Sequence, residues 1–522
     1  MKKFIYAIVA ICGLLSLSAC SGDSLNTEPT DSMSGATLMS DGVKALVPLN
    51  GIYRSMYTAG WSTTGNTHQC FGISAYNLMA EVMGDDMIMG ASGSGWFWYD
   101  AVYDVKDLFT RSTWRSYDLW KAYYTWIANA NYIIAAEETM GGATNDKNYA
   151  IGQAYAIRAY CYFMLAQTFA RTYKGHESEK CVPLYTEPTF KTTTGQARST
   201  VAETYAQIDN DINKACELLK GLPQQQSAHM SYGVAQGIRA RIALVKEDWA
   251  TAEAAAEEAI AKSGKQIAKV DEFIGLNDVT KKNVMWGAQV IADQAGGYAS
   301  LFAHMDTVAS YGLGAPKMIT LSLYNKISAT DARKAWFPDP ASYEIHSSFN
   351  PNNPDYGYNG APLQRKMFFS DPAQWLGDYI WMRVEEMYLT AAEAECRQGK
   401  DGEAREHLMA LMKERDKNYS CANKSGKTLA ALTSESTGSL LEEILLQRRI
   451  ELWGEFGRMY DIKRLKQGFV RNASDGWNSG ALLRGRPTTN PENWMWVLTI
   501  PQAEFDGNIN MDVSTDQNPL DD

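Results

Sequence analysis

Two alanine-rich segments constrain the fold of this chain more than any other feature. The first spans Gly237–Lys262 and has the sequence GIRARIALVKEDWATAEAAAEEAIAK, and the second begins at Tyr379. Both place apolar or small residues three and four positions apart on either side of a short polar turn, which is the spacing of two amphipathic helices. Because alanine lets two helix axes approach closely, each segment predicts an antiparallel helical hairpin.

Two further helical hairpins are expected elsewhere in the chain. One pairs residues 118–140 with 149–173, and the other pairs SLLEEILL at 439–446 with IKRLKQG at 462–468. Repeated helix pairs of this kind are typical of a tetratricopeptide-type solenoid. The predicted fold is therefore all-α, with about four tetratricopeptide-like hairpins interrupted by irregular, loop-rich insertions that carry aromatic residues.

The helical pattern is interrupted twice, and these interruptions define the expected organisation. Residues 41–272 form a predicted N-terminal helical region that contains an aromatic loop region at 59–107. Residues 273–522 form a C-terminal region, in which an irregular insertion over 273–378 precedes helices over 379–468. Loops with exposed aromatic side chains on a rigid scaffold are common binding surfaces.

The N-terminus has the pattern of a bacterial lipoprotein signal. A positively charged start, MKK, precedes an apolar stretch over 4–17, which ends in the motif LSAC with Cys20. This pattern predicts a signal peptide over 1–19, lipidation of the Cys20 thiol, and a polar tether over 20–40. A plain secretory signal gives no reason for a cysteine just after the cleavage site. No later window holds about twenty uninterrupted apolar residues, so we expect an anchored chain that does not span the membrane.

Charge and motifs argue against several classes of function. The net charge is −11, with no concentrated basic stripe, which disfavours nucleic-acid binding. The sequence contains no HExxH, GxSxG, P-loop or dinucleotide fingerprint, so we expect neither catalytic residues nor a cofactor. Carboxylate pairs such as Glu385/Glu386 lie in helices, where a solvated face or an ion pair with arginine explains them better than catalysis does.

No metal site is expected from the cysteines. The six that follow Cys20 are widely spaced and form no CxxC pair, which argues against zinc. A disulfide remains an alternative, but buried single thiols are favoured. Asp85 and Asp86, beside Gly84, are candidates for hydrogen bonds to a ligand or for a cation, with a simple polar loop as the alternative.

Aromatic residues gather in the segment GASGSGWFWYD, which carries Trp96, Trp98 and Tyr99. The CH-rich faces of sugars stack on such rings, while polar side chains bind the hydroxyls, and no catalysis is needed. If the segment is extended, Trp96 and Trp98 point to the same side and present a joint face. We expect one of the three rings to cover the core instead.

Several motifs together resemble those of the SusD/RagB family of Bacteroidetes outer-membrane nutrient-binding lipoproteins. They include ATDAR at Ala329–Arg333, RVEEMYLTAAEA at Arg383–Ala394 and LLQRRIELWGEFGRMYDIKR at Leu445–Arg464, besides the lipoprotein cysteine. The chain departs from the family pattern at Trp381 and over Gly454–Gly457, which leaves the fold expectation unchanged.

This resemblance implies a function and its partners. Such proteins sit like a lid on a SusC-like TonB-dependent transporter in the outer membrane, are held to its lipid through the cysteine, and capture glycans, or peptides in some members, without cleaving them. The ligand regions carried over are the loop of Trp96 and Trp98 and the loops around Tyr298 and Trp336. Two rival classes are a surface glycoside hydrolase, which needs two suitably placed carboxylates, and a structural assembly protein, which binds no small ligand.

Overall fold

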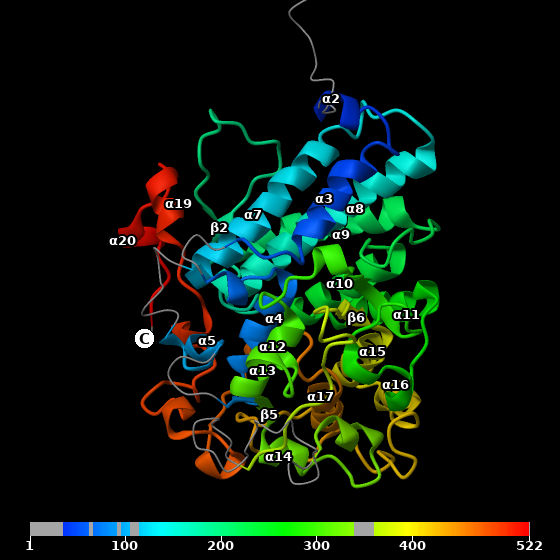
Figure 1. Cartoon of the computed structure of the whole chain (residues 1–522), viewed down its shortest axis with the longest axis vertical. Coiled ribbons are helices and arrows are strands. Elements are labelled where there is room, and N and C mark those ends of the chain that lie inside the picture. Colours follow the sequence, from blue (N-terminus) through cyan, green and yellow to red (C-terminus); the bar gives the residue numbers. More distant parts are fainter. Residues whose placement is uncertain (1–34, 62–65, 91–95, 105–113, 339–359, 521–522) are drawn as a thin grey trace, which may run out of the picture.

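The computed structural model confirms the all-α fold class. It describes residues 35–61, 66–90, 96–104, 114–338 and 360–520, and Cys20 lies outside them. Among the described residues, most secondary-structure elements are helices. Long helices lie side by side across the upper part of the molecule (Figure 1). None of the helices in these ranges is long and apolar enough to cross a membrane.

The hairpin predicted over 118–140 and 149–173 consists of α7 (Trp114–Ile134) and α8 (Thr144–Phe169). Helix α8 also packs along α9 (Val201–Leu219), so it lies between two neighbours and is buried over most of its length. Helix α9 begins with a capping box, in which the Thr200 hydroxyl accepts a hydrogen bond from the Glu203 amide at 3.1 Å. The Glu203 carboxylate in turn accepts from the Thr200 amide at 2.8 Å. This exchange satisfies amides that the first helical turn leaves unpaired.

The two alanine-rich segments form the predicted helix pairs. Helices α10 (Tyr232–Lys246) and α11 (Trp249–Ser263) make one, and α15 (Val384–Arg397) and α16 (Asp401–Met412) make the other. The alanines of α11 that face its neighbours are buried, as close packing requires. Helix α11 also packs against α15, so the two hairpins stack on each other.

The fourth predicted pair has the right helices, but they pack on different partners. Helix α17 (Leu440–Glu451) packs mainly against α15, whereas α18 (Arg458–Leu465) packs against α4 (Ile73–Val82). Gly457 permits the second contact, because it has φ of 108° and a Cβ there would lie 2.7 Å from the Ala80 Cβ. Only glycine combines this backbone conformation with such a close approach.

Helix α4 also corrects the expectation of an irregular segment over 59–107. All ten of its residues are buried, so it shows no alternation between apolar and polar faces. The same region contains the short helix α5 (Trp98–Ala101).

The described residues form three small antiparallel sheets, two of which join segments far apart in the sequence. Strand β1 (Met87–Met89) pairs with β5 (Lys317–Ile319), and β4 (Val284–Ala288) pairs with β6 (Tyr379–Arg383). Strands β2 (Lys180–Pro183) and β3 (Arg198–Thr200) form the third sheet. The β1–β5 pair brings the aromatic loop region next to the irregular insertion of the second half.

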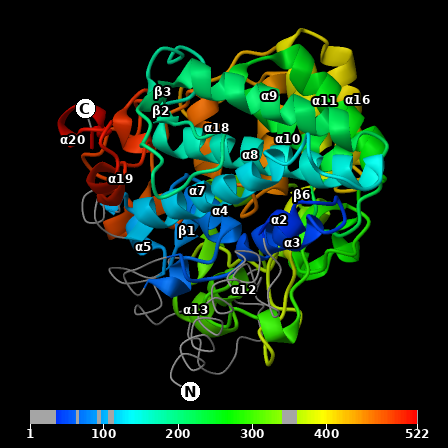
Figure 2. The ribbon, with the colours of Figure 1, turned by 90° about the horizontal axis from the view of Figure 1, so that it is seen from above.

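The remaining helices are short or lie near the chain ends. They are α2 (Gly35–Leu38), α3 (Leu46–Ser55), α12 (Leu301–Met305), α13 (Ser310–Gly314), α14 (Leu321–Tyr324), α19 (Gln502–Gly507) and α20 (Val513–Asp516). The 3-10 helices are η2 (Thr67–Gln69), η3 (Val270–Glu272), η4 (Ile274–Leu276), η5 (Ala292–Gln294), η6 (Ala332–Trp336), η9 (Ala473–Asp475), η10 (Ser479–Ala481) and η11 (Trp494–Trp496). The C-terminal helices lie beside β2 and β3 (Figure 2), and Lys180 Nζ contacts Asp516 Oδ1 at 2.8 Å.

The six cysteines after Cys20 confirm the prediction of buried single thiols. All six lie in the described ranges, and each is buried and free: Cys70, Cys161, Cys181, Cys216, Cys396 and Cys421.

Candidate functional site

Five aromatic side chains from separate segments meet at one place, which we call the aromatic surface. They are His68, Trp96, Tyr298, Tyr311 and Trp375. The Trp96 and Tyr311 rings lie 4.0 Å apart between centroids, Tyr298 stacks on His68 at 5.6 Å, and Trp375 lies 4.8 Å from Tyr298. The structure thus unites two of the predicted ligand residues, Trp96 and Tyr298.

The aromatic surface is partly open to solvent. Tyr298 is 48% exposed, and the other four side chains are half-buried. Two cavities lined by described residues, of about 530 and 880 Å³, are formed by other segments. An open array of rings suits an extended ligand that stacks on several rings at once, since aromatic faces contribute large apolar areas at little cost in side-chain entropy.

Hydrogen bonds and buried rings hold the aromatic surface in place. The Tyr311 hydroxyl lies 2.6 Å from His68 Nδ1, and His304 Nε2 lies 2.7 Å from the His68 carbonyl oxygen. Burial lowers the pKa of His304 well below its usual range, which keeps this ring neutral under the surface. Because His304 also packs edge-on against Phe97 at 5.1 Å, the surface rests on the apolar core.

The β1–β5 sheet contributes a buried lysine to this support. Lys317 Nζ donates hydrogen bonds to the carbonyl oxygens of Ala315 at 3.0 Å and of Trp96 at 3.5 Å. Burial lowers the pKa of Lys317 to about 7. The lysine therefore links the Trp96 backbone to β5, and its burial disfavours the charged form.

Three segments of the aromatic surface contain strained backbone. Phe97, next to Trp96, has φ of 71°; Ser310, next to Tyr311, has φ of 52°; and Trp375 itself has φ of 60°. Left-handed conformations are unfavourable for residues with a side chain and persist only where the surroundings enforce them. Such strain gathers at functional sites, which supports a role for this surface.

Trp98 and Tyr99 belong to the short helix α5. Trp98 is 6% exposed and begins α5, so the expected joint face of Trp96 and Trp98 on an extended segment was wrong. The physical reason is the left-handed Phe97, which turns the chain into the helix. Trp98 therefore covers the core, as expected for one of the three rings, while Tyr99 is half-buried on α5.

Trp336 lies in η6 and is 5% exposed. The Phe273 ring lies 5.9 Å from it, and Lys366 Nζ lies 4.7 Å from its centroid. Its remaining surface lines the cavity of about 880 Å³. The structure therefore places Trp336 outside the aromatic surface.

Asp85 is held by the fold. Its Oδ1 accepts a hydrogen bond from Arg458 Nε at 2.9 Å, and its Oδ2 accepts one from the Thr433 hydroxyl. Burial opposes ionisation, but the guanidinium groups of Arg458 and Arg449 outweigh it and hold the pKa of Asp85 well below its usual range. Because both oxygens serve internal partners, we do not include Asp85 in the proposed ligand surface.

Helices α15 and α17 carry similar ion pairs. Glu385 and Glu386, considered above as a carboxylate pair, contact Arg383 at 3.1 Å and Arg241 at 2.6 Å. Glu451 is contacted by Arg383 at 3.0 Å and by Arg415 at 2.9 Å. Since removal of one partner from a buried pair leaves an uncompensated charge, loss of any one of these groups would destabilise the fold.

Sequence reasoning missed His68, Tyr311 and Trp375. Trp375 follows Asp371 and Pro372 in a turn, which is where exposed binding residues are common. Tyr311 and His68 carry no comparable local signal, and only tertiary structure places them beside Trp96.

Two family profiles match separate parts of the chain. A SusD-like profile, described as starch-binding and associating with the outer membrane, matches residues 74–244, and the profile of the SusD family matches residues 342–520. Together they cover about two thirds of the sequence. The chain belongs to the SusD family. No curated protein matches it by sequence.

Solved structures of SusD-like proteins share the fold of this SusD-family chain. A SusD-like carbohydrate binding protein from Bacteroides vulgatus is 24% identical, with a TM-score of 0.72, over 90% of this chain and 97% of that chain. Surface glycan-binding protein A from Bacteroides fluxus is 18% identical, with a TM-score of 0.66, over 91% and 99%. A laminarin-binding SusD-like protein is 18% identical, with a TM-score of 0.64, over 92% and 99%.

Proposed function

We propose that this SusD-family protein is a non-catalytic cell-surface receptor that binds a glycan on the aromatic surface and delivers it to a SusC-like TonB-dependent transporter. The observation that carries the proposal is the array of part-exposed rings around His68, Trp96 and Tyr298. Membership of a family described as starch-binding and outer-membrane associated supports it, as do structural neighbours that bind glycans.

Several rings in one array favour binding to an oligosaccharide over binding to a single sugar. A ring that stacks on a sugar contributes roughly 1 to 3 kcal/mol, as a typical interface hot spot does. Contacts of this size give weak affinity singly and useful affinity together. Weak contacts at several points also allow release to a transporter.

The chemistry of the aromatic surface supports binding without cleavage. A glycosidase needs two carboxyl groups about 5 to 10 Å apart on either side of the scissile bond. The five residues that define the aromatic surface include no carboxylate. Glu386 and Glu451 are buried glutamates in the motifs at Arg383–Ala394 and Leu445–Arg464, and both are bound to arginines.

Lipidation of Cys20 would hold the receptor at the outer membrane. The predicted tether of 20–40 overlaps α2 (Gly35–Leu38), so only its part before α2 would link the folded part to the lipid. A thioether-linked lipid on Cys20, detected by mass spectrometry of the native protein, tests this part of the proposal.

Affinity electrophoresis of the purified chain in gels containing plant, host and microbial polysaccharides tests the function. We expect retardation by one glycan, its reduction in the variants Tyr298→Ala and Trp375→Ala, and no release of reducing ends. Phe190→Ala is the control, because Phe190 is also exposed but packs against Tyr132 in a different part of the molecule. Absence of retardation by every glycan would favour peptide capture, and release of reducing ends would contradict a non-catalytic receptor.

A further inference from the structure

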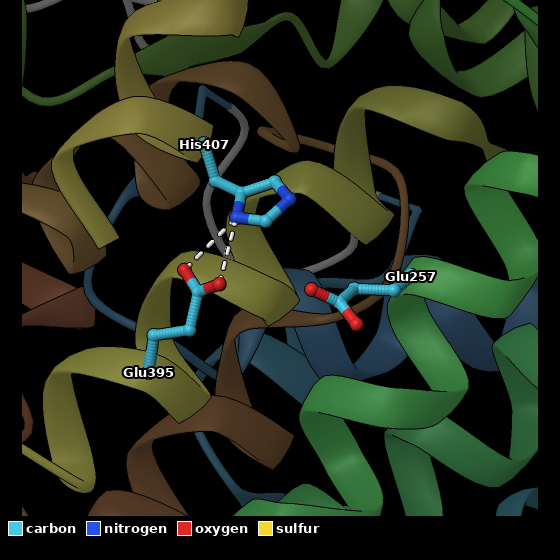
Figure 3. Close-up of side chains that lie close together, drawn as sticks. All are labelled: Glu257, Glu395 and His407. Carbon is cyan, nitrogen blue, oxygen red and sulfur yellow. Dashed lines mark hydrogen bonds and ion pairs between the residues drawn. The ribbon is translucent and has the colours of Figure 1, made fainter. Parts of the chain in front are cut away.

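Three helices of the two stacked hairpins bring a histidine and two glutamates together. Glu257 comes from α11, Glu395 from α15 and His407 from α16, and each offers one ligand atom within 4.8 Å of the others. The carboxylate of Glu257 faces the other two side chains across the space between the helices (Figure 3). His407 Nδ1 lies 2.9 Å from a carboxylate oxygen of Glu395.

Glu395 differs from the other buried glutamates of α15. It is 1% exposed, and its only side-chain hydrogen bond among the described residues comes from His407, a member of the same cluster. Three others on this helix each contact a guanidinium group. These pairs are Glu385 with Arg383, Glu386 with Arg241, and Glu393 with Arg464. A buried carboxylate without such a cation is costly, and among the described residues His407 is the only ion-pair partner of Glu395.

Further carboxylates increase the negative charge around Glu395. Glu253 and Glu403 also place an oxygen within 4.8 Å of it and of each other. Lys400 also lies at this place, and it is bound to Glu253 at 2.6 Å. Burial and the neighbouring Glu253 and Glu257 raise the pKa of Glu395, although the hydrogen bond from His407 opposes this. His407 can supply at most one positive charge, which is fewer than the carboxylates require.

We propose that Glu257, Glu395 and His407 bind a divalent zinc ion, with water in the fourth position. An imidazole nitrogen together with carboxylate oxygens suits Zn²⁺, whereas Ca²⁺ takes six to eight oxygen ligands and Mg²⁺ keeps most of its water. Tetrahedral ligation at about 2.1 Å requires ligand atoms roughly 3.4 Å apart. The Glu395–His407 pair is already this close, and Glu257 is exposed and free to rotate inward.

A zinc ion here would link α11 of one hairpin to α15 and α16 of the next. Because the three ligands come together only in the folded chain, zinc would stabilise the stacked hairpins. The cysteine pattern argues against zinc, but this set uses none of the cysteines, and its members are spread over three helices. That separation in sequence hides the site from motif searches.

Isothermal titration of the purified full-length chain, freed of metal with a chelator, tests the proposal with zinc chloride at pH 7.5. We expect one ion per chain and a weakening of at least about tenfold in both Glu257→Gln and His407→Ala. Glu406→Gln removes an exposed charge from the same helix as His407 and should bind zinc as the wild type does. We expect no saturable binding of calcium chloride.

Far-UV circular dichroism of each variant separates loss of ligation from loss of folding, and Glu257→Gln, at an exposed position, should fold normally. Absence of zinc binding to the wild type would overturn the proposal. Equal affinity of the wild type, Glu257→Gln and His407→Ala would also overturn it, because zinc would then bind elsewhere and Glu395 and His407 would form an ion pair only. The outcome is independent of glycan binding, which involves other segments.

Discussion

The ring of Trp96 lies 4.0 Å from the ring of Tyr311, with 30° between their planes. Trp96 lies in a turn before α5 and Tyr311 lies in α13, in opposite halves of the chain, and the β1–β5 sheet joins the two regions. The proposed ligand surface therefore forms only when both halves have folded. Isolated loops could not hold these rings in their relative positions, because they would lose the contacts that maintain the strained backbone next to the rings.

Trp98 and Tyr298 should respond to substitution in opposite ways. Trp98→Ala removes a buried ring and should lower the free energy of unfolding by about 3 to 5 kcal/mol, with little change in glycan affinity. Tyr298→Ala removes an exposed ring and should lower glycan affinity with little change in stability. Urea denaturation and affinity electrophoresis of both variants check this. A loss of affinity in a stably folded Trp98→Ala protein would return Trp98 to the ligand surface.

Asp85→Asn should destabilise the protein without altering the ligand surface directly. The substitution leaves the Arg458 and Arg449 guanidinium groups without one of their buried anions. Loss of one partner of a buried ion pair costs about 3 to 5 kcal/mol. Urea denaturation measures the change, and Glu217→Gln, at an exposed position, is the control. If Asp85→Asn and the wild type have the same midpoint of urea unfolding, the ion-pair account of Asp85 is wrong.

Lys317 should make stability depend on pH above neutrality. Its pKa is about 7 in the folded protein and near 10.5 in the unfolded chain, so between these values the unfolded chain binds more protons. The free energy of unfolding of the wild type should therefore rise with pH in this window, and Lys317→Met should lack this contribution. Between pH 7 and 8.5 the difference between the two proteins should grow by about 1 to 2 kcal/mol in favour of the wild type. Urea denaturation at both pH values measures it, and a constant difference would show that Lys317 stays charged in the folded protein.

Gly457→Ala should weaken the contact between α18 and α4. The new methyl group would meet the Ala80 Cβ at 2.7 Å, and the φ of 108° would be strained. We expect a loss of about 1 to 3 kcal/mol in the free energy of unfolding. Gly402→Ala is the matched control, because it lies in α16 with open space around it and should be neutral or slightly stabilising. Equal stability of the two variants would remove the argument for a close approach at Gly457.

The helical scaffold was largely predictable from local spacing. Alanines such as Ala252, Ala255 and Ala259 repeat at helical intervals and are buried between helices, so the sequence pattern and the packing coincide. The pattern failed for α4, where burial on every side removes the amphipathic signal. The pattern also gave the wrong packing partners for α17 and α18, because these partners depend on the turn between the two helices.

The candidate site was predictable only in part. Trp96 and Tyr298 stand in glycine-containing loops, and such loops indicate exposed aromatic residues. His68 and Tyr311 join them through tertiary contacts that no local pattern encodes. Trp98 was misplaced because a left-handed conformation at Phe97, a residue that rarely adopts one, changes the direction of the chain.

The most direct test of the glycan-receptor account is isothermal titration with an oligosaccharide from the polysaccharide that retards the protein. It compares the wild type, the double variant Tyr298→Ala/Trp375→Ala and the control Phe190→Ala. We predict a loss of affinity of at least about fivefold in the double variant, which corresponds to about 1 kcal/mol, and wild-type affinity in the control. Wild-type affinity in the folded double variant would contradict the assignment of the aromatic surface as the glycan-binding site.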